Sequence, residues 1–290
     1  MLFLNILKKG KAKKLMIEDL LKPFSTNHSI REAVISVFLV NPLIKPERFQ
    51  ELFESGFSPD FHLYQNLGSL QIQIKQGNAS IVQQNAQNLG STGFQFIGFE
   101  KGKISRILQG MNQGLNDGTR TFISYHSFSY TRWKEYLNEY LKFIKLLSSF
   151  QNDLFINAIS IHYVDQFKWI SDSPIDLSKV FNDKTRYMSK AFLASTGPTN
   201  FIFTTQKNQD NFLYVDRLEI KIDDQKSNDI SISHNITKQL DDIKNLNLLL
   251  NNDSSYFNDL LLELHQYNKQ ILGDILNPEV KDLIKLPAEK

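Results

Sequence analysis

Apolar and polar residues alternate along several stretches of the chain, as they do in strands that face a core on one side and water on the other. In 69–75 leucine and isoleucine alternate with glutamine and lysine, and 211–222 alternates likewise, interrupted by Asp216 on its apolar side. The same pattern predicts further strands over 32–40, 93–99, 103–109, 119–126, 155–165 and 199–205. The turn Glu100-Lys101-Gly102 joins two of these strands as a hairpin. Successive hairpins favour an antiparallel sheet with a solvated face.

Helical spacing of apolar residues marks fewer segments. One apolar stripe runs from Thr131 to Phe150, with Ser129 as the expected N-cap. We expect a short helix after Pro46 and longer helices over 236–250 and 254–273. A last helix opens at Asn277-Pro278, where a capping residue precedes proline at the first helical position.

The order of these elements predicts an α+β protein. We expect antiparallel-rich sheets in two consecutive halves, a long central helix and a C-terminal helical layer. The chain divides into a basic N-terminal tail or extension (1–28), a first α+β half (29–150) and a second half with the C-terminal helices (151–290). The two halves are expected to form one compact unit.

Composition narrows the class of protein. The 290 residues include no cysteine, which excludes a disulfide scaffold and a thiolate metal site, and 12% aromatic residues argue against disorder. No stretch reaches the roughly 18–20 apolar residues of a membrane span, and we expect a cytoplasmic protein. The 33 basic and 31 acidic residues give a net charge of +2, which does not favour nucleic acid as a partner.

Five short motifs occur together in order along most of the chain: SIREAVISV at 29–37, GFQF at 93–96, YTRWKEY at 130–136, ISIHYVD at 159–165 and LHQYN at 264–268. In this order they resemble a sporadically distributed bacterial family. That family has an N-terminal EAV(I/F)xI strand, a C-terminal LHxxN helix and no assigned activity.

The chain departs from the family pattern at three positions. Ser29 or Ile30 stands where the family has proline, His162 replaces an arginine and Asp165 replaces an asparagine. The resemblance therefore implies the fold and no catalytic residue. The sporadic distribution associates the family with phage-defence or toxin–antitoxin genes, which is an association and not a mechanism.

No motif for nucleotide binding, zinc proteolysis or serine hydrolysis occurs, and the sequence predicts no cofactor and no metal. The weak catalytic candidates are His126, His162 and Asp165, because a histidine beside a carboxylate can act as a general base. They would have to converge in one cleft. The alternative is that both histidines are strand residues bonded to the polar face of the sheet.

Basic residues near aromatic ones are weak candidates for binding nucleic acid. They are Lys8, Lys9, Lys11, Lys13, Lys14, Arg132 and Lys134. The alternative at the last two is core packing, because Trp133, Tyr136 and Tyr140 share the helical stripe.

The sequence thus favours a non-enzymatic accessory protein that recognises a protein partner, in a bacterial phage-defence or toxin–antitoxin setting. The first alternative is an enzyme or nuclease-like effector that uses His126, His162 and Asp165. The second is a nucleic-acid-binding protein that uses the basic N-terminal tail.

Overall fold

The computed structural model describes residues 16–43, 48–68, 72–75, 78–81, 91–112, 121–209, 212–223 and 228–286. The strands are β1 (Leu21–Pro23), β2 (Ile30–Leu39), β3 (Leu63–Gly68), β4 (Ile72–Lys75), β5 (Asn78–Ile81), β6 (Ser91–Glu100), β7 (Lys103–Met111), β8 (Thr121–Ser127), β9 (Phe155–Trp169), β10 (Thr199–Gln209), β11 (Phe212–Asp223) and β12 (Asp229–Asn245). The helices are η1 (Ile17–Asp19), α1 (Phe49–Leu52) with its π-helical continuation η3 (Phe53–Phe57), α2 (Trp133–Phe150), α3 (Leu177–Val180), α4 (Lys190–Leu193), α5 (Leu246–Asn252), α6 (Ser254–Ile275) and α7 (Pro278–Leu283).

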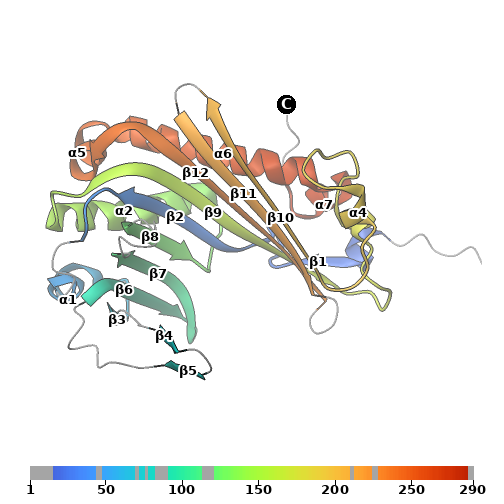
Figure 1. The fold of residues 1–290 in the computed structure, drawn as a ribbon, viewed down its shortest axis with the longest axis horizontal. Helices are drawn as coiled ribbons and strands as arrows, with labels where there is room; N and C mark the ends of the chain where they lie inside the picture. The colour runs from blue at the N-terminus through green and yellow to red at the C-terminus, as the bar shows by residue number, and fades with distance from the viewer. Residues whose placement is uncertain are drawn as a thin grey trace, which may run out of the picture.

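One large antiparallel sheet dominates the molecule (Figure 1). Its strand order is β10-β11-β12-β9-β2-β8-β7-β6-β3, and the short β1 pairs with the end of β9. The strands β4 and β5 form a separate hairpin. The predicted α+β fold with an antiparallel sheet is confirmed.

The two halves of the chain build the sheet in the same order. In the first half β2 lies beside β8, followed by β7 and β6; in the second half β9 lies beside β12, followed by β11 and β10. Each half then closes with a long helix, α2 or α6. The halves join through the antiparallel pair β2–β9, where Ser36 lies opposite Ser160. This junction pairs two strands that would otherwise be exposed edges.

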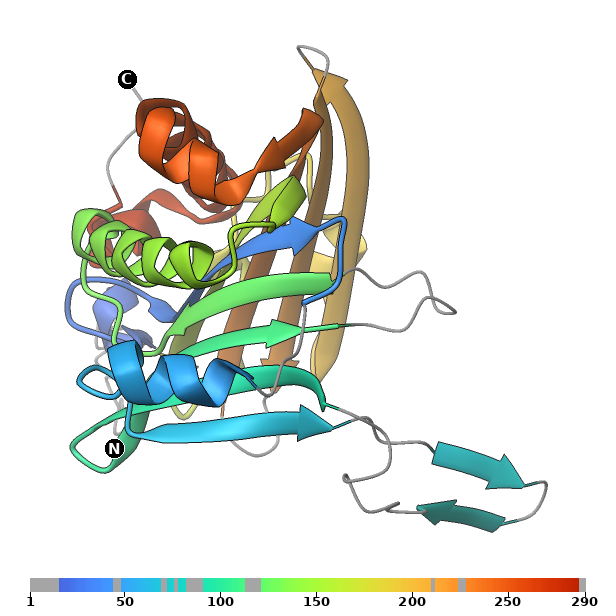
Figure 2. The ribbon, with the colours of Figure 1, turned by 90° about the vertical axis from the view of Figure 1, so that its left-hand side faces the viewer.

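The helices pack on one face of the sheet (Figure 2). Alternate strand residues such as Ile35, Ile161 and Ile236 are fully buried there against α2, α5 and α6. A second cluster packs α3, α4, α7 and the end of α6 against the same face of β11 and β12, through residues such as Ile220 and Ile232. We call the opposite face of the sheet the open face.

Uncharged polar side chains form a row across the open face. Successive strand partners in this row are Gln65, Gln95, Gln109, Ser124, Ser36, Ser160, Thr237, Val215 and Gln206. Eight of these nine side chains are polar and uncharged. Gln65 and Gln206 at the two ends of the row are exposed, whereas Ser124 and Ser160 near its middle are buried. The polar face that the alternation predicted is therefore solvated mainly toward its edges.

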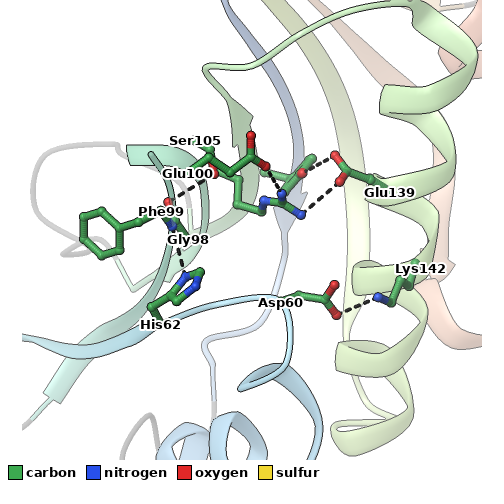
Figure 3. Close-up of polar contacts among 10 residues, drawn as sticks. Asp60, His62, Gly98, Phe99, Glu100, Ser105, Glu139 and Lys142 are labelled. Atoms are coloured by element: carbon green, nitrogen blue, oxygen red, sulfur yellow. Dashed lines mark hydrogen bonds and ion pairs between the residues drawn. The ribbon is translucent and has the colours of Figure 1, made fainter. Parts of the chain in front are cut away.

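A network of polar contacts fastens α2 to the first half of the sheet (Figure 3). Arg106 of β7 donates to Glu139 of α2 at 3.0 Å and also pairs with Glu100. The buried Tyr125 hydroxyl donates to the other oxygen of Glu139 at 2.8 Å. One turn further along α2, Lys142 pairs with Asp60 at 2.6 Å. Because each charge in the network has a partner, we assign it a structural role.

The prediction of a helix over 236–250 is wrong in its first part. Residues up to Asn245 belong to strand β12, and helix α5 begins only at Leu246. The buried positions 230–240 alternate strictly, but two of them are His234 and Lys238, and these polar residues hid the strand pattern. Asp216 interrupts the apolar side of β11 for the same reason, since it pairs with His234.

Other boundaries differ less. The central helix begins at Trp133 with Arg132 as its N-cap, so Ser129 is not the cap. The predicted hairpin of β6 and β7 forms around Lys101 and Gly102, both of which have positive φ angles of 51° and 74°. Residues 69–71 of the first predicted strand lie outside the described residues. In the described part of the chain, no helix is both long and apolar enough to span a membrane.

Candidate functional site

A cavity of about 320 Å³ lies where the two halves of the chain meet. The start of β2, the middle of β9, the residues that lead into α2, one face of α6 and the segment after α7 all contribute to its wall. We call it the Asp165 pocket, and its chemically distinctive residues are Ser29, Tyr130, Trp133, Tyr163, Asp165 and His265.

Asp165 is the buried acid of this pocket. Its side chain is 1% exposed, and Ser29 Oγ donates to its Oδ1 atom at 2.5 Å. Burial raises the pKa of this carboxyl to about 6, although the Ser29 hydrogen bond and the nearby His234 act in the other direction. Among the described residues it forms no ion pair. A buried carboxylate without a cationic partner is unfavourable, and Asp165 also lies on the wall of the cavity, where a ligand can reach it.

Aromatic rings line the pocket beside this acid. The imidazole of His265 lies parallel to the Trp133 indole, with ring centroids 4.2 Å apart and an interplanar angle of 3°. His265 Nδ1 lies 2.9 Å from the Tyr163 hydroxyl. Tyr130 packs edge-on against Tyr163 at 5.9 Å. Burial and the nearby Lys269 lower the pKa of His265 to about 3, so its ring is neutral at physiological pH.

Three cationic residues surround the mouth of the pocket: Arg132, Lys269 and Lys285. Arg132 is the N-cap residue of α2, and its side chain makes no capping hydrogen bond. Lys285 donates to the Asn27 amide oxygen at 2.6 Å. The N-terminus of α2, a helix of 18 residues, lies beside these cations. The helix N-terminus and the cationic side chains both favour binding of an anion.

Of the three catalytic candidates from the sequence, His126 and His162 lie on the same face of the sheet near Glu32, and Asp165 does not join them. His126 and His162 project onto the open face, whereas Asp165 lies on the helix-covered face in the pocket. The physical reason is the two-residue period of a strand: positions 162 and 165 of β9 differ by three and therefore point to opposite faces. The expectation that these residues converge in one cleft is wrong.

On the open face His126 has a different carboxylate partner. Its Nδ1 lies 2.9 Å from Glu32, and its Nε2 lies 2.9 Å from Ser124 Oγ and 3.1 Å from the Gln109 amide. The His126 hydrogen bond lowers the pKa of Glu32. His162 Nε2 separately contacts Ser233 Oγ at 2.7 Å.

Ser124, His126 and Glu32 are connected by hydrogen bonds in the same order as the serine, histidine and acid of a serine hydrolase triad. Ser124, however, is 2% exposed, and β8 is paired on both sides by β7 and β2. Backbone amides committed to the ladder cannot stabilise an oxyanion. These contacts match the alternative expected from the sequence, in which strand histidines bond to the polar face.

A second buried acid, Asp216, has two side-chain partners. Asp216 of β11 lies 2.5 Å from His234 Nε2 of β12 and accepts from the Tyr267 hydroxyl at 3.3 Å. Asn268 of α6 donates to the His234 carbonyl at 3.2 Å. This layer ties α6 to the sheet. No cluster of three potential metal-ligating residues occurs in the described segments of the chain.

The nucleic-acid candidates are separated in the structure. Lys8, Lys9, Lys11, Lys13 and Lys14 lie outside the described residues. Arg132 and Lys134 are exposed at the start of α2, and Arg132 belongs to the mouth of the pocket. Trp133, expected in the core, is only partly buried and lines the pocket, whereas Tyr136 and Tyr140 are buried as expected.

Sequence reasoning missed most of the pocket. It singled out Asp165 but did not place Ser29, Tyr130, His265 or Lys269 near it. The signal that was available is local: an acid at an inward position of a strand that is otherwise apolar.

Comparisons with protein-family models, curated proteins and solved structures found no match. The resemblance of the five motifs to a sporadically distributed bacterial family therefore stays a prediction.

Proposed function

We propose that this protein is a non-enzymatic binding protein that holds a small ligand in the Asp165 pocket. The observation that carries this proposal is a buried carboxyl, 1% exposed and without an ion-pair partner in the described residues, on the wall of a 320 Å³ cavity. This volume lies at the lower end of the range of small-molecule sites, about 300–1,000 Å³.

The comparison with Asp216 supports a ligand over a purely structural role for Asp165. Both acids are buried on the same face of the sheet. Asp216 has a histidine and a tyrosine as partners, whereas Asp165 has a single serine donor. A ligand that donates to Asp165 would add a second partner to this acid.

The histidine and the tyrosines of the pocket favour binding over catalysis. His265 has a pKa of about 3, far below the range in which a histidine exchanges protons at neutral pH. Burial raises the pKa values of Tyr130 and Tyr163, so both hydroxyls stay protonated. Such groups orient a ligand by hydrogen bonds and stacking and do not transfer protons readily.

Native mass spectrometry tests this function. The full chain is incubated with a fractionated bacterial metabolite extract, and we expect one small molecule to bind in a 1:1 complex. Thr131→Trp, at an exposed residue of the pocket wall, should block binding, whereas Lys145→Ala on the exposed side of α2 should not. Absence of any bound metabolite from a folded wild-type protein would overturn the proposal.

A second candidate function is recognition of a protein partner through the open face. The row of mostly uncharged polar side chains across nine strands supports it, because such side chains can form hydrogen bonds across a protein interface. The phage-defence or toxin–antitoxin setting belongs to this proposal as an association of the resembling family.

Pull-down from the native host tests this second candidate. We expect a stoichiometric partner that is lost when Gln109→Arg and Gln206→Arg place two charges on the open face. Retention of the partner by this double variant would refute docking on the open face.

A further inference from the structure

We propose that the ligand of the Asp165 pocket is a guanine mononucleotide. The base edge would donate to Asp165, the ring would lie among the aromatic side chains, and the phosphate would sit at the cationic mouth. This inference rests on the proposed function and adds the chemical class of the ligand.

The buried acid selects the base. An ionised carboxylate accepts hydrogen bonds and donates none. Its two oxygens can accept two parallel hydrogen bonds from adjacent donors. Among the common bases, guanine presents such a pair, N1–H and the N2 amino group. Adenine and cytosine place a ring acceptor beside their amino group, which a carboxylate would repel. Uracil has one N–H between two carbonyl acceptors.

The pocket walls fit a flat ring. Trp133, Tyr130, Tyr163 and a neutral His265 surround the space next to Asp165. Bases stack favourably on aromatic side chains whatever their sequence. A neutral imidazole stacked on the indole widens this aromatic surface without adding charge.

The residues at the mouth of the pocket favour a phosphate group. Arg132 and Lys269 line it together with the first residues of α2, and neither side chain forms an ion pair among the described residues. The acid in the first turn of α2, Glu135, is bonded to the Thr131 hydroxyl. Phosphate binds readily at a helix N-terminus flanked by arginine and lysine.

The size of the cavity limits the ligand. A volume of about 320 Å³ holds one mononucleotide and is too small for an oligonucleotide. The pocket therefore holds a single nucleotide unit.

Isothermal titration calorimetry on the full chain compares GMP, guanosine and AMP. We expect GMP to bind at least 10-fold more tightly than AMP. Asp165→Asn should weaken GMP binding by about 10- to 100-fold, because hydrogen bonds to a charged group contribute about 1.5–3 kcal/mol and 1.4 kcal/mol is a factor of ten. Asp172→Asn, at an exposed acid, is the matched control.

The phosphate arm of the experiment uses Lys269→Ala, with Lys145→Ala as its control. We expect Lys269→Ala to weaken GMP and to leave guanosine unchanged. Lys269 is half-buried. If Asp165→Asn fails to fold, Lys269→Ala still tests the proposal. Equal affinity for GMP and AMP, or GMP binding that neither variant changes, would overturn the inference.

The outcomes separate the two proposals. If a metabolite binds and Thr131→Trp blocks it, but GMP does not bind at millimolar concentration, the nucleotide proposal fails. The proposal that the pocket is a ligand site then stands. If neither GMP nor any metabolite binds the folded protein, both proposals fail.

Discussion

At the scale of single residues, the contrast between two buried acids gives this protein its most informative chemistry. Asp216 is held by His234 and Tyr267, and Asp165 by Ser29 alone. The groups that face Asp165 are Ser29, His234, Tyr130 and Tyr163, with His265 and Lys269 across the pocket. Its ionisation therefore opposes folding in the absence of a ligand.

We predict a pH-dependent loss of stability from Asp165. Its pKa rises from 3.8 to about 6 on folding, so between these values the unfolded chain releases the proton while the folded chain keeps it. The contribution to the free energy of unfolding falls through this window by about 3 kcal/mol and is constant above it. His265, with its pKa lowered to about 3, changes stability in the opposite direction over the same pH range in both proteins. The fall should therefore appear as the difference between the wild type and Asp165→Asn in urea denaturation from pH 4 to 7. An identical pH profile for both proteins would contradict it.

At the scale of elements, the close approach of β6 and β7 depends on glycine. A Cβ atom on Gly93 would lie 2.2 Å from the Gly110 carbonyl oxygen and 2.9 Å from Met111 Cα. Both are backbone atoms of β7, which cannot move away without breaking the ladder.

We therefore expect Gly93→Ala to lower the free energy of unfolding by about 1–3 kcal/mol, the usual effect of overpacking. The matched control is Gly273→Ala in α6, where the nearest atom is 3.9 Å away. This control should raise stability by about 0.5–1 kcal/mol because alanine favours the helix. Chemical denaturation measures the free energy of unfolding of both variants. A Gly93→Ala protein as stable as the wild type would show that the β7 backbone can move to make room for the Cβ atom.

The attachment of α2 to the sheet depends on the Tyr125–Glu139 hydrogen bond more than on the exposed ion pair beside it. We expect Tyr125→Phe to lower stability by about 1 kcal/mol, because Glu139 loses the hydrogen bond donated by a buried hydroxyl. Lys142→Ala should change stability by less than about 0.5 kcal/mol, since its side chain is 58% exposed. Equal losses in the two variants, measured by thermal unfolding, would contradict this ranking.

At the scale of the whole molecule, the two halves share one sheet and one apolar cluster. The central pair β2–β9 belongs to both, and one apolar cluster contains Ile35 from the first half and Ile236 and Phe257 from the second. Separating the halves would expose two long strand edges and this cluster.

We predict a single cooperative unfolding transition. Ile161 is fully buried beside Ile35 and Ile236 at the centre of the sheet, so Ile161→Ala should destabilise the protein by about 2–5 kcal/mol. Circular dichroism and tryptophan fluorescence should shift together, since Trp133 and Trp169 lie in different halves. Two separate midpoints would show that the halves unfold independently.

Local pattern was sufficient for much of the fold. Alternation in 93–109 and the apolar stripe of 131–150 predicted β6, β7 and α2 to within two residues. The pattern failed at 236–245, because His234 and Lys238 occupy inward positions where their partners, Asp216 and Glu263, are supplied by distant elements. Polar residues in a core are not visible as core residues until their partners are known.

The spacing of neighbouring residues was enough to predict most strands and helices, apart from 236–245, and an antiparallel sheet with one polar face. Only the tertiary structure decided that Asp165 and His162 face opposite sides of β9, and that His126 pairs with Glu32. It also brought Ser29, Trp133, Asp165 and His265 around one cavity. The physical reason is that strand order and helix docking join residues more than two hundred positions apart, and no local period encodes that pairing.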